Sequence, residues 1–184
     1  PRVVPARWPP RPSARLADSL PSALFVVVHL SLSGGPDGLA ASAVAAFLAH
    51  GADVHLPMIA TELPAHLAWR GDARVHAATV SLDHESQVTA FYGALPDLWA
   101  SIHLVGGFAM GPIAETSLAE FEKQWRLNAV TCFLGCREAV KAIRRGKGGG
   151  RIVNVAARPV LEPVPNMTAY AAAKAEGRAL KQSL

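Results

Sequence analysis

The chain has 184 residues, of which 51% are hydrophobic and 17% are charged, and its formal net charge is +4. This length and composition predict one folded domain with a sizeable core and exclude a wholly disordered chain. Much of the positive charge lies in residues 1–22, where four arginines accompany one aspartate, so the charge does not indicate a nucleic-acid-binding surface. No apolar run reaches the roughly 18 residues that a membrane span needs.

The two cysteines, Cys132 and Cys136, stand four residues apart, and no histidine is close to them in the sequence. We interpret them as small apolar residues on a packed helix. The seven histidines are scattered without a ligand pattern, so we expect no metal. Because the chain shows neither a disulfide framework nor a secretion signal, we expect a cytoplasmic protein.

Residues 1–22 are rich in proline, arginine and serine and have no apolar periodicity. This composition predicts a disordered extension, with residues 23–184 forming the domain. A polyproline ligand or a targeting segment are less favoured interpretations of the same residues.

Strand-like and helix-like segments alternate along the rest of the chain. Strands are expected at 24–30, 53–56, 74–80, 101–105 and 152–155, and helices at 39–50, 84–94, 117–145 and after residue 165, with a weaker helix at 61–70. This alternation predicts an α/β fold, a doubly wound parallel sheet of about five strands with helices on both faces.

The longest helix begins with a capping signal, because Ser117 precedes Glu120 by three residues. Five apolar side chains then recur at helix-compatible spacings and are expected to face the core: Phe121, Trp125, Phe133, Val140 and Ile143.

Three glycines, Gly34, Gly35 and Gly38, lie between the first expected strand and the first expected helix. Glycine lets a pyrophosphate approach the helix N-terminus, where free N–H groups favour anions. A plain tight turn is the alternative interpretation.

Tyr170 and Lys174 are four residues apart in the last expected helix and therefore share one face. A neighbouring ammonium favours the phenolate, so we expect the pKa of Tyr170 to be lowered. Such a tyrosine can exchange a proton with a substrate oxygen.

The glycine turn, the Asn128 of the long helix and the Tyr170-x-x-x-Lys174 motif after the strand Arg-Ile-Val-Asn-Val occur in this order. Together they resemble the short-chain dehydrogenase/reductase family. The resemblance implies a Rossmann-type fold and hydride transfer between NAD or NADP and a carbonyl or alcohol substrate.

Site residues follow from the same resemblance. Tyr170 would be the acid/base, Lys174 would lower its pKa and hold the nicotinamide ribose, and Asn128 would support a proton relay. The implied cofactor-binding residues are Ser33, Gly34, Gly35, Gly38, Asp83, Val105, Gly106, Asn154, Tyr170 and Lys174. The choice between NAD and NADP stays open, because residues 57–59 contain neither an acid nor a base.

The chain departs from the family pattern at several positions. The family's catalytic serine falls at position 157, which is Ala157, and the motif after the fourth strand is altered around Val105 and Gly106. The family continues beyond the Tyr170 helix with two further strands, which leaves the fifth strand as an expected edge.

Two functions are therefore considered. One is an oxidoreductase of this family, and the other is a non-catalytic relative that binds a dinucleotide or oligomerises. The resemblance also implies a homodimer or homotetramer formed through the long helix and the Tyr170 helix.

Overall fold

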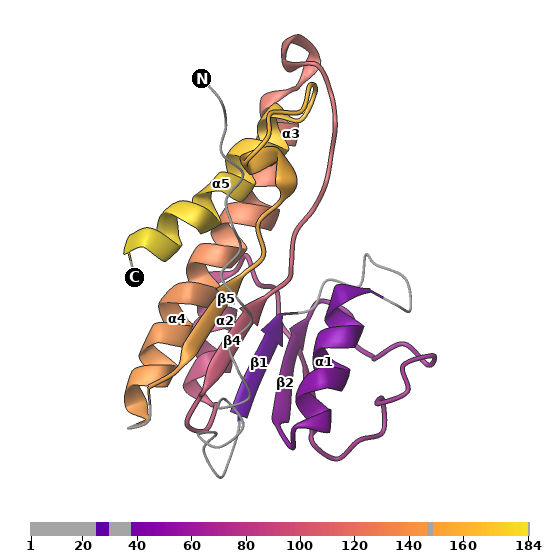
Figure 1. Ribbon diagram of the computed structural model, residues 1–184, viewed down its shortest axis with the longest axis vertical. Helices are drawn as coiled ribbons and strands as arrows, with labels where there is room; N and C mark the ends of the chain where they lie inside the picture. Colours follow the sequence, from indigo (N-terminus) through magenta and orange to yellow (C-terminus); the bar gives the residue numbers. More distant parts are fainter. Residues whose placement is uncertain (1–24, 30–37, 147–148, 184) are drawn as a thin grey trace, which may run out of the picture.

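The computed structural model describes residues 25–29, 38–146 and 149–183 (Figure 1). The predicted extension at 1–22 and three residues of the glycine turn, Ser33, Gly34 and Gly35, lie outside these ranges. Within the ranges, no helix is both long enough and apolar enough to span a bilayer.

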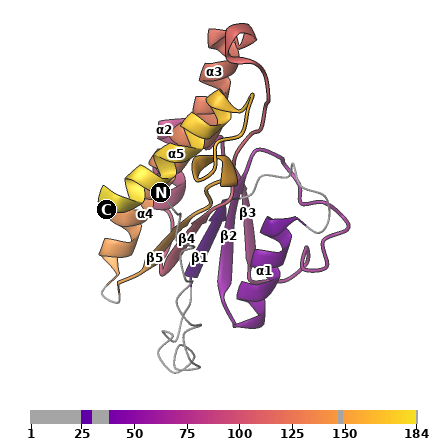
Figure 2. The same ribbon diagram turned by 45° about the horizontal axis from the view of Figure 1, so that its top comes forward.

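A five-stranded sheet with the order β3-β2-β1-β4-β5 forms the centre of the molecule, and each neighbouring pair is parallel. Its strands are β1 (Phe25–His29), β2 (Asp53–Met58), β3 (Val75–Thr79), β4 (Ala100–His103) and β5 (Arg151–Asn154). The order reverses between β1 and β4, as in doubly wound dinucleotide-binding folds, which confirms the predicted class. Figure 2 shows β5 at one edge and β3 at the other.

The longer helices are α1 (Leu39–Ala49), α2 (Glu85–Gly93), α3 (Leu118–Trp125), α4 (Thr131–Arg145) and α5 (Thr168–Ser183). Short turns of helix occur at η2 (Ile113–Glu115) and η4 (Arg158–Val160). Gly51 ends α1 as predicted, because it has a φ of 78° and donates its N–H to the Leu48 carbonyl.

The alternation of side chains along the strands builds two cores, one on each face of the sheet. In β4, Ala100 and Ile102 join the core beneath α1. Ser101 and His103 are also buried but point to the opposite face, where α2 and α4 pack. The predicted helices on both faces are therefore observed (Figure 1).

The long helix is continuous from α3 to α4, but residues Arg126–Val130 (η3) form a π-helical turn. Ser117 caps it as predicted, with Oγ accepting from the Glu120 N–H at 3.2 Å. A π turn contains an additional residue, so the phase of the inward face shifts across it. π turns are frequent at functional positions, and this one contains Asn128.

The predicted inward face of this helix is wrong for its three aromatic residues, whereas Ile143 packs against the core as expected. Phe121, Trp125 and Phe133 are 37%, 40% and 44% exposed. The side chains that face the molecule are smaller or polar, and they include Gln124, Asn128, Cys132, Cys136 and Ala139. The prediction assumed that the α-helical period of 3.6 residues continues through Arg126–Val130, where the π turn interrupts it. It also assumed that large apolar side chains are buried, whereas these aromatic side chains are exposed.

The predicted weak helix at 61–70 is also absent, and turns occupy this stretch. Leu67 and Arg70 donate their N–H groups to carbonyls three residues back. Trp69 folds onto α1, where its Nε1 donates to the Ala41 carbonyl at 3.2 Å. The loop thereby covers the sheet on the α1 side without a second helix.

Candidate functional site

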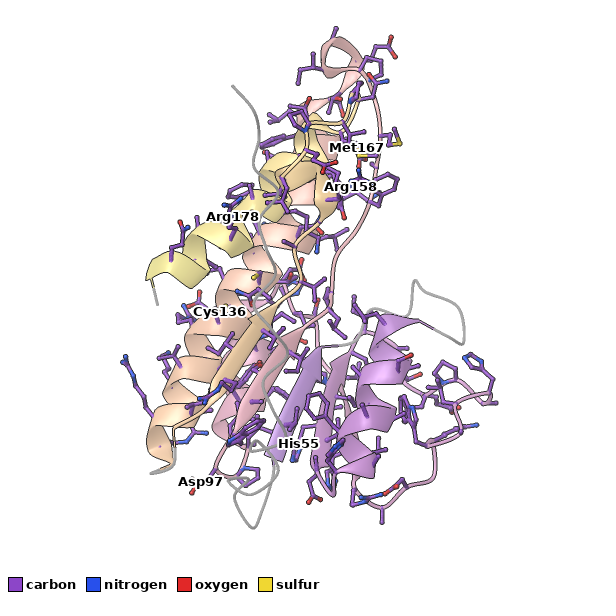
Figure 3. All side chains as sticks on the ribbon, in the orientation of Figure 1. His55, Asp97, Cys136, Arg158, Met167 and Arg178 are labelled. Atoms are coloured by element: carbon purple, nitrogen blue, oxygen red, sulfur yellow. The ribbon has the colours of Figure 1, made fainter. Side chains whose placement is uncertain are left out.

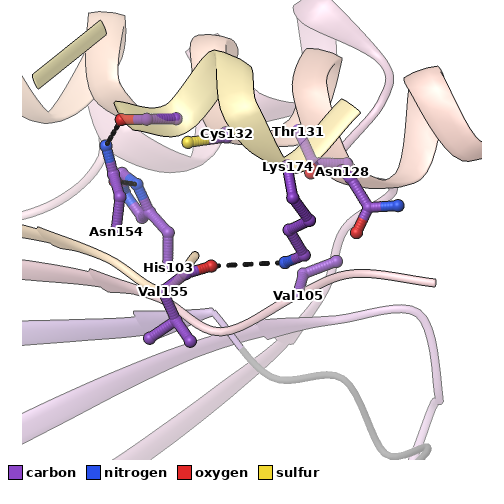
Figure 4. Close-up of a pocket in the computed structure, with 9 residues that line it drawn as sticks. His103, Val105, Asn128, Thr131, Cys132, Asn154, Val155 and Lys174 are labelled. Atoms are coloured by element: carbon purple, nitrogen blue, oxygen red, sulfur yellow. Dashed lines mark hydrogen bonds between the residues drawn. The ribbon is translucent and has the colours of Figure 1, made fainter. Parts of the chain in front are cut away.

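The carboxyl ends of β4 and β5 lie beside the π turn and α5, and this junction brings together several residues of the predicted site. The Lys174 Nζ, projecting from α5, donates to the Val155 carbonyl just after β5 at 3.3 Å (Figure 4). In parallel α/β sheets, ligands bind at this end of the strands, near the point where the strand order reverses.

Asn128 fastens the π turn to the loop after β4. Its Oδ1 accepts from the Gly107 N–H at 3.2 Å, and its Nδ2 donates to the Gly107 carbonyl at 3.0 Å. Nδ2 also donates to the Gln124 carbonyl at 2.9 Å, which fixes the amide relative to its own helix. The side chain is only 3% exposed, so these bonds replace hydration.

Asn128 and Lys174 both lie close to Gly106. A Cβ atom at this position would lie 2.5 Å from the Asn128 Oδ1 and 2.7 Å from the Lys174 Nζ. The absence of a side chain is therefore what allows the amide and the ammonium to meet over the loop backbone.

These groups surround a small cavity, in which the space open to the centre of a water molecule is about 10 Å³ (Figure 4). It is lined by His103, Val105, Asn128, Thr131, Cys132, Asn154, Val155, Lys174 and Gly177. Four predicted site residues, Val105, Asn128, Asn154 and Lys174, thus meet in one place, with Gly106 against two of them.

Tyr170 lies one helical turn before Lys174 and is half-buried. Its ring packs edge-to-face on Phe108, with 5.0 Å between the ring centroids. Burial raises the pKa of the Tyr170 phenol, which corrects the expected lowering by Lys174. Burial also lowers the pKa of Lys174, so this ammonium is less stabilised than an exposed one.

Asp83 and Gly38 do not line this cavity. Gly38 precedes α1 and accepts from the Ser42 N–H. Asp83 precedes α2, where it accepts from the Ser81 hydroxyl at 2.7 Å and pairs with His84. The Ser81 hydrogen bond, opposed by partial burial, lowers the pKa of Asp83, so its carboxylate is charged at neutral pH.

Ala157, at the position of the family serine, begins the η4 turn and has extended backbone angles. The Val160 N–H donates to its carbonyl at 3.0 Å. The fold therefore keeps the turn at this position while no hydroxyl is present.

A chain of polar groups adjoins the cavity through His103 and Asn154, and the sequence interpretation missed it. It runs from the Tyr92 hydroxyl to Ser101 Oγ (2.8 Å), from Ser101 to His103 Nε2 (2.9 Å), and from His103 Nδ1 to Asn154 Oδ1 (2.7 Å). Asn154 Nδ2 then lies 3.3 Å from Cys136 Sγ. His103 and Asn154 are register partners in β4 and β5, so this link follows from strand pairing.

The two cysteines belong to this polar cluster rather than to an apolar face. His103 and the cysteines place their ligand atoms within 4.8 Å of one another, and all three residues are buried. A hydrogen bond from Cys132 lowers the pKa of Cys136 against the effect of burial. We expected no metal because no histidine is close to the cysteines in the sequence. In the folded chain His103 lies beside both cysteines, so this reason does not hold. One feature of the sequence could have indicated this cluster: Ser101 and His103 are two residues apart in an expected strand, so their side chains share one face.

A parallel sheet of this order, with helices on both faces, defines a Rossmann-type α/β fold. The family model described as short chain dehydrogenase matches residues 29–184, and the chain belongs to this family.

Individual relatives agree with this assignment. The chain is 29% identical over 171 residues to levodione reductase from Leifsonia aquatica, an alignment covering 86% of the chain and 62% of that enzyme. It is 34% identical over 96 residues to a short-chain type dehydrogenase/reductase from Picea abies, covering 49% of the chain and 35% of the relative. The chain thus spans less than two thirds of the length of these relatives.

Solved structures show the same fold. A crystal structure of levodione reductase superposes with a TM-score of 0.75 at 25% identity, covering 87% of this chain and 64% of that one. The ligand-free aldohexose dehydrogenase of Thermoplasma acidophilum superposes with a TM-score of 0.74 at 18% identity, covering 88% and 60%.

Proposed function

We propose that this protein is an NAD(P)-dependent oxidoreductase that transfers hydride between a nicotinamide cofactor and a carbonyl or alcohol substrate. The observation that carries the proposal is the convergence of Lys174, Asn128 and Gly106 at the carboxyl end of β4, one helical turn from Tyr170. The family membership and the names of its relatives, levodione reductase among them, support the same activity.

The residues fit a dinucleotide in three respects. Gly106 has no side chain, which lets Lys174 lie against the loop backbone after β4. An ammonium carries three donors, of which one goes to the Val155 carbonyl, so Lys174 has donors for ribose hydroxyls. Gly38 lies at the N-terminus of α1, where backbone N–H groups and the helix dipole favour a phosphate. Residues 57–59 favour neither NAD nor NADP.

The bound cofactor would supply the hydride donor or acceptor. Tyr170 would give a proton from its hydroxyl to the carbonyl oxygen during reduction and take it back during oxidation. The raised pKa keeps the phenol protonated at neutral pH, which is the form needed for reduction. Lys174 would stabilise the phenolate that forms, and Asn128 would hold the loop after β4 in place.

The experiment combines the reduced cofactors with a panel of ketones and follows the loss of nicotinamide absorbance. Tyr170→Phe should lose most of the turnover and keep cofactor binding, because it removes only the proton donor. Ala172→Ser, at an exposed position of the same helix, serves as the control and should keep both. Turnover that survives Tyr170→Phe would contradict the assigned role.

Ala157 favours a second candidate, a relative that binds the dinucleotide without catalysis. Loss of a hydroxyl that polarises a carbonyl costs on the order of 10²–10³ in rate. Calorimetry separates the candidates, because cofactor binding without turnover, unchanged by Tyr170→Phe, would support the non-catalytic protein.

We also propose that copies of the chain associate through α3 and α4. The outward side chains of Phe121, Trp125 and Phe133 support this, since exposed aromatic groups are enriched at interfaces. Light scattering coupled to gel filtration should show a dimer or tetramer that Phe133→Ser weakens. A monomeric wild-type chain would contradict the proposal.

A further inference from the structure

We propose that His103, Cys132 and Cys136 form a binding site for a thiophilic divalent metal ion, with Zn²⁺ as the expected ion. This site is separate in chemistry from the proposed hydride transfer, although both adjoin the same cavity. Its occupancy is measured without cofactor or substrate, so either proposal can fail alone.

The three ligand atoms lie within 4.8 Å of one another, close enough for one ion to draw them together. Cys132 and Cys136 are one turn apart on α4 and therefore point the same way, toward the end of β4. Zn–S bonds of about 2.3 Å and Zn–N bonds of about 2.0–2.1 Å in a tetrahedron place S and N about 3.6 Å apart. The distance from Cys136 Sγ to His103 Nδ1 is 3.6 Å.

The chemistry of the donors selects the ion. Two thiolates and an imidazole suit Zn²⁺ and disfavour Mg²⁺ or Ca²⁺, which require oxygen ligands. Zn²⁺ binds both sulfurs as thiolates, so each thiol that is protonated in the metal-free chain releases its proton to solvent. The complex of Zn²⁺ with two thiolates and a neutral imidazole carries no net charge, and a neutral complex is less costly to bury than a charged one.

The surroundings hold the imidazole in the orientation that the ion needs. A histidine that binds metal through Nδ1 carries its proton on Nε2, and Nε2 lies 2.9 Å from the Ser101 Oγ. Ser101 is in turn held by Tyr92 at 2.8 Å, and both are fully buried. Such hydrogen bonds to the second ring nitrogen accompany almost all histidine ligands of metals.

The fourth coordination position faces Asn154 and the cavity. Asn154 Oδ1 is hydrogen-bonded to His103 Nδ1 at 2.7 Å and lies 3.4 Å from Cys136 Sγ. Zn²⁺ would replace this hydrogen bond, with the ring proton on Nε2 and the nitrogen and oxygen about 3.4 Å apart as two ligands of one tetrahedral ion. The cavity beside it has room for about one water molecule. An amide or water oxygen therefore completes the tetrahedron. Figure 4 shows His103, Asn154 and Cys132 around this space, and Figure 3 shows Cys136 between α4 and the sheet.

The experiment titrates the reduced, metal-free chain with Zn²⁺ against a chromophoric chelator under anaerobic conditions. We expect one ion per chain, with release of the Cys132 thiol proton. Co²⁺ should give thiolate-to-metal charge-transfer absorption and the visible bands of a tetrahedral ion. X-ray absorption of the zinc-loaded wild-type chain should show two sulfur neighbours at about 2.3 Å and nitrogen or oxygen neighbours at about 2.0 Å.

Variants assign the ligands. Cys132→Ser, Cys136→Ser and His103→Gln should each weaken Zn²⁺ binding by more than about 100-fold, which exceeds the 10–100-fold expected when a supporting residue such as Ser101 is changed to Ala. His66→Gln, at an exposed histidine, is the matched control and should bind as the wild type does. Circular dichroism of each metal-free variant checks that it folds.

Two results would overturn the proposal. One is a reduced wild-type chain that binds no stoichiometric Zn²⁺. The other is a bound ion whose absorption spectrum shows no sulfur neighbours, which places it on surface histidines. The wild-type spectrum decides this point even where a variant fails to fold.

Discussion

Asn128 and the backbone of Gly107 exchange two hydrogen bonds, one in each direction, at 3.2 and 3.0 Å. This pair joins the π turn of the long helix to the loop after β4. It therefore positions the loop that contains Gly106, which lies against Lys174.

Asn128→Ala should lower the free energy of unfolding by about 1–3 kcal/mol, because partly buried backbone groups lose their partner. Asn128→Asp should destabilise similarly, since a carboxylate cannot donate to the Gly107 and Gln124 carbonyls. Denaturant unfolding measures both effects. Gln182→Ala, an exposed change on α5, is the reference, and equal stability of the two alanine variants would contradict the role of Asn128.

Gly106→Ala should weaken cofactor binding and lower stability, because the new methyl group would meet Asn128 Oδ1 at 2.5 Å and Lys174 Nζ at 2.7 Å. Lys174 can move aside, but Asn128 is held by its hydrogen bonds. Calorimetric titration with NADH and NADPH, together with thermal unfolding, tests this. Gly93→Ala is the matched change at a position with open space, and there we expect unchanged binding. Equal behaviour of the two variants would refute the close approach.

Ala157→Ser should raise turnover by about 10²–10³ if Tyr170 acts as the acid/base, because it restores a hydroxyl that can polarise a carbonyl. The turn should accept the change, since position 157 is the N-cap of η4 and serine is favoured at such caps. Initial rates with the same ketone panel measure the gain. Ala156→Ser, one residue earlier and exposed, should give none.

Glu138 should make the fold sensitive to acid. Its carboxylate is buried and accepts hydrogen bonds from Arg137 and Lys141, each at 2.8 Å. Burial alone would raise the pKa of Glu138, but the hydrogen bonds from Lys141 and Arg137 bring it below its ordinary value of 4.5. Its stabilising effect is therefore complete above the unfolded pKa and is lost as pH falls through the lower folded pKa.

Glu138→Gln should thus be destabilising at pH 7 and become indistinguishable from the wild type in acid. Urea unfolding at a series of pH values measures the difference. Glu122→Gln, on the exposed side of α3, should change the stability little at any pH. A constant destabilisation by Glu138→Gln across the series would contradict the link to ionisation.

The predicted elements and the observed ones agree where one physical signal dominates. The apolar runs in β1, β2 and β5 and the capping serine of α3 are local features, and each was placed from neighbouring residues alone. The expected helix at 61–70 is absent. The contact of Trp69 with α1, which is distant in the sequence, holds this segment as a series of turns.

The sequence by itself determined the fold class through the periodicity of its elements, the family through the order of its motifs, and the one-turn spacing of Tyr170 and Lys174 through their separation along one helix. Only the tertiary structure decided which face of the long helix is buried, since the π turn shifts its period. Only the tertiary structure brought His103 to Cys136, 33 residues along the chain, because strand register and helix packing create that contact.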